Sequence, residues 1–240
     1  MKLQKLLSLV RRAADDYNMI SENDRIAVGL SGGKDSLALL YALKTMQNFY
    51  PKKYDLMAVT VSLGFAGCDF SPLYDICAKL QVPFYLAETE IGRIIFDERK
   101  EKNPCSLCSK MRKGALHNEA LKHGANKIAL GHNKDDVIQT LFMSMFYEGR
   151  IHTFSPVSYL DRKNLFSVRP LVYVPEADAK GFVNKYGLTT VVNPCPANGY
   201  TSREETKRFI ETQRKNYPDF DEKIFTAIKK SEIEGWGKNV

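Results

Sequence analysis

The chain has 240 residues, of which 44% are hydrophobic and 26% are charged, and its formal net charge at pH 7 is +7. This composition is typical of a globular protein, and the length allows one large domain or one domain with a smaller extension. No apolar run approaches the length of a membrane span, and the N-terminus lacks the apolar core of a signal peptide, so we expect a cytoplasmic protein outside the membrane. The positive charge suits a polyanionic partner such as a nucleic acid.

The hydrophobic pattern predicts alternating helices and strands over the first two thirds of the chain. In chain order we expect a helix at 3–19, a strand at 25–30, a helix at 35–46, a strand at 55–62, a helix at 71–80, a strand at 84–87, a helix at 109–123, a strand at 127–130 and a helix at 134–147. Strands that alternate with helices form βαβ crossovers, so the prediction is an α/β fold with a parallel, doubly wound sheet.

The pattern changes after about residue 149. There we expect loops or a hairpin at 153–168, a helix at 175–186, a strand at 189–192 and two charged amphipathic helices at 201–216 and 219–235. The basic residues of these last helices indicate either a solvated face or a contact with nucleic acid.

We expect three regions: an N-terminal helical extension at 1–22, a nucleotide-binding domain at 23–200 and a C-terminal helical tail at 201–240. The amphipathic N-terminal helix is able to pack on a partner subunit, which would make a homodimer.

One motif follows the first expected strand and opens the next helix: Ser31, Gly32, Gly33, Lys34, Asp35 and Ser36. The glycines let the backbone approach a ligand, and the start of the helix offers unpaired N–H groups to an anion. The lysine adds a positive charge, the serines donate to phosphate oxygens, and the aspartate either caps the helix or faces a metal. A tight turn without a ligand is the alternative, but this combination favours a phosphate-binding loop that is shorter than a Walker A loop.

A second motif, Gly131 to Asp136, follows the expected strand at 127–130. Because ligands bind beyond the carboxyl ends of parallel strands, we expect this segment beside the first motif. Its two carboxylates, Asp135 and Asp136, suit a magnesium site, and the alternative is that they stabilise the start of the following helix.

Three of the five cysteines form the third motif. Cys105 and Cys108 make a C-x2-C pair, and Cys195 stands between two prolines. The residues leave four alternatives open: a structural zinc site with a histidine ligand, a redox dithiol with a resolving or persulfide-carrying third thiol, an iron–sulfur cluster with one open iron, and purely structural thiols. We expect the other two cysteines, Cys68 and Cys77, to be small core residues.

The first motif resembles the PP-loop of ATP pyrophosphatases, which bind ATP by its pyrophosphate and transfer AMP to a carbonyl oxygen. The chain as a whole is similar to the TtcA-like tRNA 2-thiocytidine synthetases, an iron–sulfur-dependent tRNA thiolation branch of that superfamily. The matching segments occur in family order between about residues 25 and 200: 31–36, 105–108 followed by Lys110, Arg112 and Lys113, 131–136, 169–171, and 194–196 followed by Gly199. The chain lacks the flanking zinc-finger cysteines of archaeal-type 2-thiouridine enzymes and a further cysteine motif after Cys195.

The resemblance implies that ATP and Mg²⁺ adenylate the C2 carbonyl oxygen of a pyrimidine in tRNA, cytidine first, and that sulfur replaces this oxygen as AMP and PPi leave. It implies tRNA and a sulfur donor, either a cysteine desulfurase or free sulfide, as partners. Sulfur would arrive through a 4Fe-4S cluster with three cysteine ligands, Cys105, Cys108 and Cys195. The catalytic residues it implies are these cysteines with Asp136 and Arg112. The residues it implies for nucleotide binding are Ser31, Gly32, Gly33, Lys34, Asp35, Ser36, Gly131, His132 and Asp135.

Other functions on the same fold remain alternatives at this point. They are 2-thiouridine synthesis, thiolation by a persulfide on Cys108 and Cys195, an amide- or lysine-ligating enzyme such as a tRNA lysidine synthetase, and a nucleotide-binding redox sensor without turnover. A ligase of this kind has no use for three loop cysteines.

Overall fold

The computed structural model describes residues 1–101, 104–191, 194–195 and 202–237. Its centre is a six-stranded sheet in the order β3-β2-β1-β4-β6-β5. The strands are β1 (Asp24–Gly29), β2 (Tyr54–Val61), β3 (Phe84–Ala87), β4 (Lys127–Ala129), β5 (Val157–Leu160) and β6 (Leu165–Val168). Every neighbouring pair is parallel except the antiparallel hairpin of β5 and β6. The predicted α/β class and the parallel sheet are confirmed, and the segment at 153–168 contains the hairpin.

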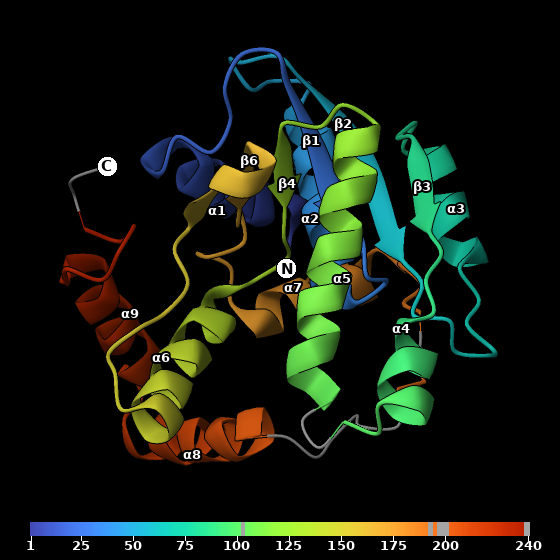
Figure 1. Cartoon of the computed structure of the whole chain (residues 1–240). Coiled ribbons are helices and arrows are strands. Elements are labelled where there is room, and N and C mark those ends of the chain that lie inside the picture. The colour runs from blue at the N-terminus through green and yellow to red at the C-terminus, as the bar shows by residue number, and fades with distance from the viewer. Residues whose placement is uncertain (102–103, 192–193, 196–201, 238–240) are drawn as a thin grey trace.

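Helices cover both faces of the sheet (Figure 1). They are α1 (Leu3–Asp16), α2 (Lys34–Met46), α3 (Ser71–Lys79), α4 (Ile91–Arg93) continued by the π-helical turn η1 (Ile94–Glu98), α5 (Pro104–Lys122), α6 (Lys134–Glu148), α7 (Glu176–Lys185), α8 (Ser202–Asn216) and α9 (Phe220–Lys230); a 3-10 turn, η2 (Asp161–Lys163), joins β5 to β6.

The two faces of the sheet build two hydrophobic cores. Ile26 and Val28 of β1 point into the larger core, which α1, α2, α6, α7 and α9 complete. Ala27 of the same strand points to the other face and packs with Leu116 and Ala120 of α5 in the smaller core. This alternation follows from the two-residue period of a strand, and burial on both faces explains why the central strands are apolar. The two layers leave the carboxyl edge of the sheet as the place where loops gather.

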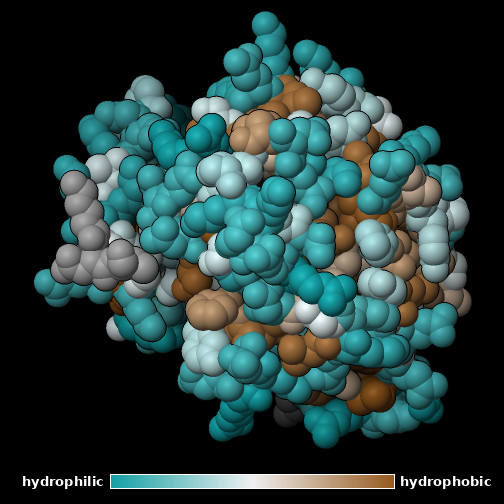
Figure 2. Space-filling view, turned by 90° about the horizontal axis from the view of Figure 1, so that it is seen from above, coloured by the Kyte–Doolittle hydropathy of each residue, from teal (hydrophilic) through white to brown (hydrophobic). Residues whose placement is uncertain are grey.

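The N-terminal helix packs within its own chain. Leu6, Val10 and Ala13 of α1 are fully buried, and the helix contacts α2 and α7. Its apolar face is therefore used inside the fold, while the division into three regions and the homodimer stay predictions. None of the helices in the described part of the chain is long and apolar enough to cross a membrane. Seen from above, hydrophilic side chains cover most of the surface, with hydrophobic groups scattered among them (Figure 2).

Four segments differ from the expected pattern. Helix α5 begins at Pro104, a residue that is tolerated at a helix start, so the C-x2-C pair lies on its first turn and does not precede it. Residues 189–191 are not a strand, because the N–H of Val191 donates to the carbonyl of Gly32 in the PP-loop; Val192 lies outside the described residues. Helix α9 ends at Lys230, and the helical segment at 91–98 was not expected.

Replacing Leu6 by alanine tests whether α1 is part of the main core. We expect Leu6→Ala to lower the free energy of unfolding by about 2–5 kcal/mol, because it opens a cavity under a side chain with 0% exposure. Urea denaturation measures this, and Ser8→Ala, an exposed position of the same helix, is the control. An unchanged unfolding midpoint in Leu6→Ala would show that the helix is only an appendage.

Candidate active site

The PP-loop closes tightly between β1 and α2. Gly32 has a φ of +79°, and a Cβ at this position would stand 2.7 Å from the Cβ of Val191, so glycine is required for two reasons. The hydroxyls of Ser31 and Ser36 lie 3.2 Å apart, and Gly33 is the N-cap of α2 without a side-chain cap. The first N–H groups of α2 therefore point to a place where an anion can bind.

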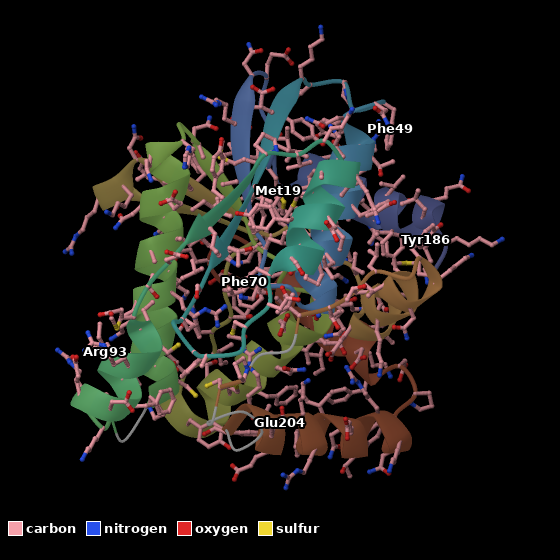
Figure 3. All side chains as sticks on the ribbon, turned by 90° about the vertical axis from the view of Figure 1, so that its right-hand side faces the viewer. Met19, Phe49, Phe70, Arg93, Tyr186 and Glu204 are labelled. Carbon is pink, nitrogen blue, oxygen red and sulfur yellow. The ribbon has the colours of Figure 1, made fainter. Side chains whose placement is uncertain are left out.

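A cavity of about 510 Å³ lies beside this loop at the carboxyl ends of β1, β2 and β4. One wall is apolar and includes Val61, Leu63, Phe65 and Phe70, which suits a flat heteroaromatic ring. Phe70 is partly buried, and in the side view it lies above α8, on which Glu204 is labelled (Figure 3). Polar lining groups come from the PP-loop and α5: Ser31, Gly33, Ser109, Arg112 and Lys113. The cavity thus combines an apolar wall with groups that bind phosphate.

The segment from Gly131 to Asp136 approaches the PP-loop as expected. A Cβ on Gly131 would meet the backbone N of Ser36 at 3.0 Å, so this residue brings the two loops into contact. Asn133 is the N-cap of α6, and its side chain and that of Asp136 form a capping box. The capping role thus holds for Asp136, although the cap itself is Asn133, which the sequence pattern did not single out. Asn133 also donates to Asp35 at 3.0 Å and so ties both loops together.

His132 lines the cavity and is electrically neutral at physiological pH. Burial, together with the positive charges of Arg169, Arg203 and Lys113, lowers its pKa to about 3. Its ring lies against that of Phe154, with 4.9 Å between the ring centroids, and its Nδ1 is enclosed without a hydrogen-bond partner.

The three cysteines of the third motif do not themselves line the cavity, but two of them adjoin residues that do. Ser109, which follows Cys108, and Pro194, which precedes Cys195, both line it. Burial raises the pKa of the Cys108 thiol, the charge of Arg112 opposes this, and Cys195 and Cys105 raise the pKa further, so Cys108 interacts electrostatically with both other thiols. In the described residues no group of three or more His, Cys, Asp or Glu side chains is arranged to hold a metal ion. Cys108 is therefore near the other two thiols, but the described side chains are not arranged as a complete set of metal ligands.

The other two cysteines differ from each other. Cys77 is buried in the larger core, as expected, and burial raises its pKa to about 11. The expectation was wrong for Cys68, which is partly exposed and lines the cavity because the loop after β2 carries it there.

Comparisons with known proteins agree with this geometry. Residues 4–210 match the PP-loop domain family. The tRNA-cytidine(32) 2-sulfurtransferase of Cellvibrio japonicus is 37% identical over 95% of this chain and 76% of its own length. The protein of that name from Shewanella halifaxensis is 38% identical over 95% of this chain and 74% of its own length. The chain belongs to the PP-loop family, in the branch of the tRNA-cytidine(32) 2-sulfurtransferases.

Solved structures share the fold of this family member. The U34-tRNA thiolase NcsA from Methanococcus maripaludis, with its [4Fe-4S] cluster, aligns with a TM-score of 0.74 and 24% identity, over 92% of this chain and 76% of that one. An NH3-dependent NAD synthetase from Campylobacter jejuni aligns with a TM-score of 0.51 and 15% identity, over 94% and 91% of the two chains.

Sequence reasoning missed the charged face that α8 presents to this site. Arg203 pairs with Asp136 at 2.9 Å, Lys207 with Glu176 at 3.7 Å, and Arg214 with Asp135. These basic residues stand at positions i, i+4 and i+11 of one helix, with the buried Ile210 at i+7, so they share one face. This helical spacing is visible in the sequence, and it would have predicted that the three basic residues share one face of α8.

The three carboxylates predicted for the site are all paired, and none of them lines the cavity. Asp35 accepts from Lys34 and Asn133, Asp135 accepts from Arg214 and the N–H of Glu176, and Asp136 accepts from Arg203 and the N–H of Asn133. Hydrogen bonds of this kind stabilise the ionised carboxylate.

Lys34 is held by two carboxylates in this structure. Its Nζ lies 2.9 Å from Asp35 and 2.8 Å from Glu176. Burial lowers the pKa of Lys34, but its hydrogen bonds to Glu176 and Asp35 outweigh burial, and the pKa is raised. A phosphate that binds to Lys34 must therefore compete with Glu176, and Lys207 is the cation that stays beside Glu176.

Replacing Glu176 by glutamine should strengthen ATP binding. The change removes a charge that competes with phosphate for Lys34, and we expect the Kd for ATP to fall about two- to fivefold, in line with the energy of a partly exposed ion pair. Calorimetry with ATP in the absence of tRNA measures this, with Glu211→Gln, an exposed position of α8, as the control for lost charge. Weaker ATP binding would show instead that Glu176 takes part in holding the nucleotide.

Proposed function

We propose that this chain is an ATP-dependent tRNA sulfurtransferase, which replaces the C2 oxygen of a cytidine in tRNA by sulfur and releases AMP and PPi. One observation carries the proposal: a single cavity is lined by the PP-loop and also by Arg112, Ser109 and Pro194, which adjoin the cysteine-bearing segments. Membership of the tRNA-cytidine(32) 2-sulfurtransferase branch supports cytidine 32 as the target.

The PP-loop would bind the pyrophosphate part of ATP. The N–H groups at the start of α2, Lys34 and the hydroxyls of Ser31 and Ser36 supply the donors, and the apolar wall with Phe65 receives the adenine. The cytidine oxygen attacks the α-phosphorus, PPi leaves, and the adenylated oxygen becomes a good leaving group. Sulfide then attacks C2, and AMP departs with the oxygen. Arg112 lies on the wall where it would stabilise charge developing on the α-phosphate.

Magnesium would enter this site together with ATP. The carboxylates of Asp35, Asp135 and Asp136 are already paired, and Mg²⁺ is generally bound by one or two carboxylates, phosphate oxygens and water. Asp35 is the first candidate for its protein ligand, because it belongs to the PP-loop. Asp136 stays our proposal for a role at the reacting base, held in place by Asn133 and Arg203.

The thiols of Cys105, Cys108 and Cys195 fit an iron–sulfur cluster by their chemistry, since soft thiolate donors favour iron over hard cations. Cys105, Cys108 and Cys195 would hold such a cluster, which would supply the sulfide for the exchange. In this proposal the protein contributes the ligands from α5 and from the segment of Cys195, and Arg112 lowers the cost of thiolate charge at Cys108. The sulfur donor is a cysteine desulfurase or free sulfide.

Nucleoside mass spectrometry of tRNA tests the function directly. In a strain without the gene we expect 2-thiocytidine to be lost, and to return with the wild-type gene. Cys195→Ser should fail to restore it while the purified variant still binds ATP in calorimetry, because the PP-loop is intact. Cys77→Ala, which alters a cysteine of the core, is the matched control and should restore the modification.

Two outcomes would contradict this proposal. Unchanged thionucleosides in the deletion strain would refute tRNA thiolation by this chain. Protein purified without oxygen should carry about four irons, and full activity in iron-free protein would refute the cluster in favour of a persulfide mechanism.

Arg203 should control the pH dependence of the reaction through Asp136. Burial raises the pKa of Asp136, and the Asn133 N–H and Arg203 oppose this by stabilising the carboxylate. Without Arg203 the pKa rises further, so the carboxylate appears at higher pH. We expect Arg203→Gln to move the acid limb of tRNA-dependent PPi release to higher pH, and Arg208→Gln, at an exposed position of α8, to leave it in place. An unmoved acid limb in Arg203→Gln would show that ionisation of Asp136 does not limit the reaction.

A further inference from the structure

A tRNA that reacts in the cavity has to lie mostly outside it. The cavity of about 510 Å³ has the size of a pocket for one small ligand, and ATP would fill much of it. A base that enters must leave its stack, as in other enzymes that modify bases, and the phosphates on both sides of it stay on the protein surface. A face next to the mouth of the cavity therefore has to receive these phosphates.

The cations that α8 presents to the site are already balanced by carboxylates. Arg203, Lys207 and Arg214 each form an ion pair with an aspartate or glutamate of α6 or α7. The exposed positions of the same helix mix cations with carboxylates. A polyanion gains little from such charges, because it has to replace a partner that is already bound. Helix α8 is therefore a poor surface for the phosphates of a tRNA.

Helix α5 and the turn η2 carry positive charge that the protein does not balance in this way. Helix α5 has four cationic residues and one carboxylate, and that carboxylate is paired within the helix. Lys110 and Lys113 of α5 and Arg162 and Lys163 of η2 are exposed. In the part of the chain that the structure describes, none of these four side chains forms an ion pair with a carboxylate. We call their common surface the α5–η2 face.

The α5–η2 face is continuous and begins at the cavity. Lys113 lines the cavity, and it shares one side of α5 with Lys110 and His117, which stand at i−3 and i+4. Lys163 reaches this helix, because its Nζ donates to Asn118 Oδ1 at 2.8 Å. Burial, together with the charges of Lys113 and Lys163, lowers the pKa of His117, so both cations are near this imidazole. The positive face thus extends from the mouth of the cavity to η2.

Gly114 leaves an open place on this face. Glycine weakens a helix relative to alanine, and a Cβ on Gly114 would have no heavy atom within 4 Å. Its φ is not positive, so neither packing nor backbone geometry within the described protein requires glycine here. It lies one helical turn after Lys110 and one turn before Asn118, which accepts from Lys163. A glycine between cations allows the backbone of a bound polymer to approach closely.

We propose that the α5–η2 face binds the sugar–phosphate backbone of the tRNA beside the cavity, with Gly114 as the point of closest approach. The proposal rests on the function proposed above, because that function supplies the tRNA. Unbalanced cations favour a polyanion, since each phosphate that they neutralise releases counterions. Lysine is a point charge that contacts phosphate without reading the base, so this face positions the tRNA and the cavity selects the base.

Removal of the charges of η2 tests the electrostatic part of the proposal. For the double variant Arg162→Gln/Lys163→Gln we expect the Kd for unmodified tRNA to rise about tenfold at about 0.1 M salt, and the slope of log K against log salt to fall by about one to two. The Kd for ATP without tRNA should change by less than about twofold, because η2 does not line the cavity. The matched control is Lys180→Gln/Lys185→Gln, two exposed cations of α7 on the other side of the sheet, which should bind tRNA as the wild type does.

Replacing Gly114 by leucine tests the close approach. Leucine is a good helix former and the protein leaves space for it, so the melting temperature of Gly114→Leu should not fall. The side chain would keep the tRNA backbone away from α5, and we expect the Kd for tRNA to rise about fivefold or more. Differential scanning fluorimetry and filter binding with the same tRNA measure the two effects.

Four results would overturn the proposal. The first is unchanged tRNA affinity and salt slope in the double variant. The second is unchanged tRNA affinity in Gly114→Leu. The third is unchanged tRNA binding in the double variant with thiolation that fails with a cysteine desulfurase but not with free sulfide, which would assign the face to a protein donor. The fourth is weaker binding of both tRNA and ATP with a lower melting temperature, which would show a role in folding only.

Failure of the proposed function gives a different result. Wild-type protein would then bind tRNA, and the double variant would bind it less tightly, but no 2-thiocytidine would form in either case.

Discussion

The close contact between the loops that follow β1 and β4 is the constraint on which the site depends. Gly131 leaves no room for a side chain against the start of α2, and Gly32 leaves none against Val191. These contacts bring the PP-loop, the start of α6 and Val191 to one edge of the sheet. Parallel strands make this possible, because their carboxyl ends all point to that edge and the connecting helices occupy the faces.

The charges at this edge are balanced from outside the sheet. The carboxylates near the PP-loop would repel both each other and the phosphates of a nucleotide, and α8 places a row of cations against them. Lys34 belongs to this network through its ion pair with Glu176. A phosphate that binds to Lys34 therefore has to replace Glu176 as its partner. Arg169 stands apart from this network, because no carboxylate of the described residues pairs with it.

The strands and most helices were predictable because their hydrophobic periods are strong and local. The start of α5 was not predictable in this way. The C-x2-C pair was expected in a loop before the helix, but it lies in the helix itself, which begins at Pro104. The segment at 189–191 is apolar enough for a strand, but its backbone pairs with Gly32, a contact that no local pattern reveals. Cys68 was misplaced for the same reason: its neighbours resemble a core helix, while the loop after β2 turns it toward the cavity.

The amino-acid sequence by itself determined the α/β class, the PP-loop and the order of the motifs, because each of these depends on residues that are close in the chain. Only the tertiary structure decided which charges meet. The pairs of Arg203 with Asp136 and of Lys34 with Glu176 join residues far apart in sequence, and they form because the fold brings α8 and α7 to the carboxyl edge of the sheet. The surroundings of Arg169 were likewise decided in three dimensions, since its guanidinium donates to Ser155 and Ser158 and lies over the ring of Phe154.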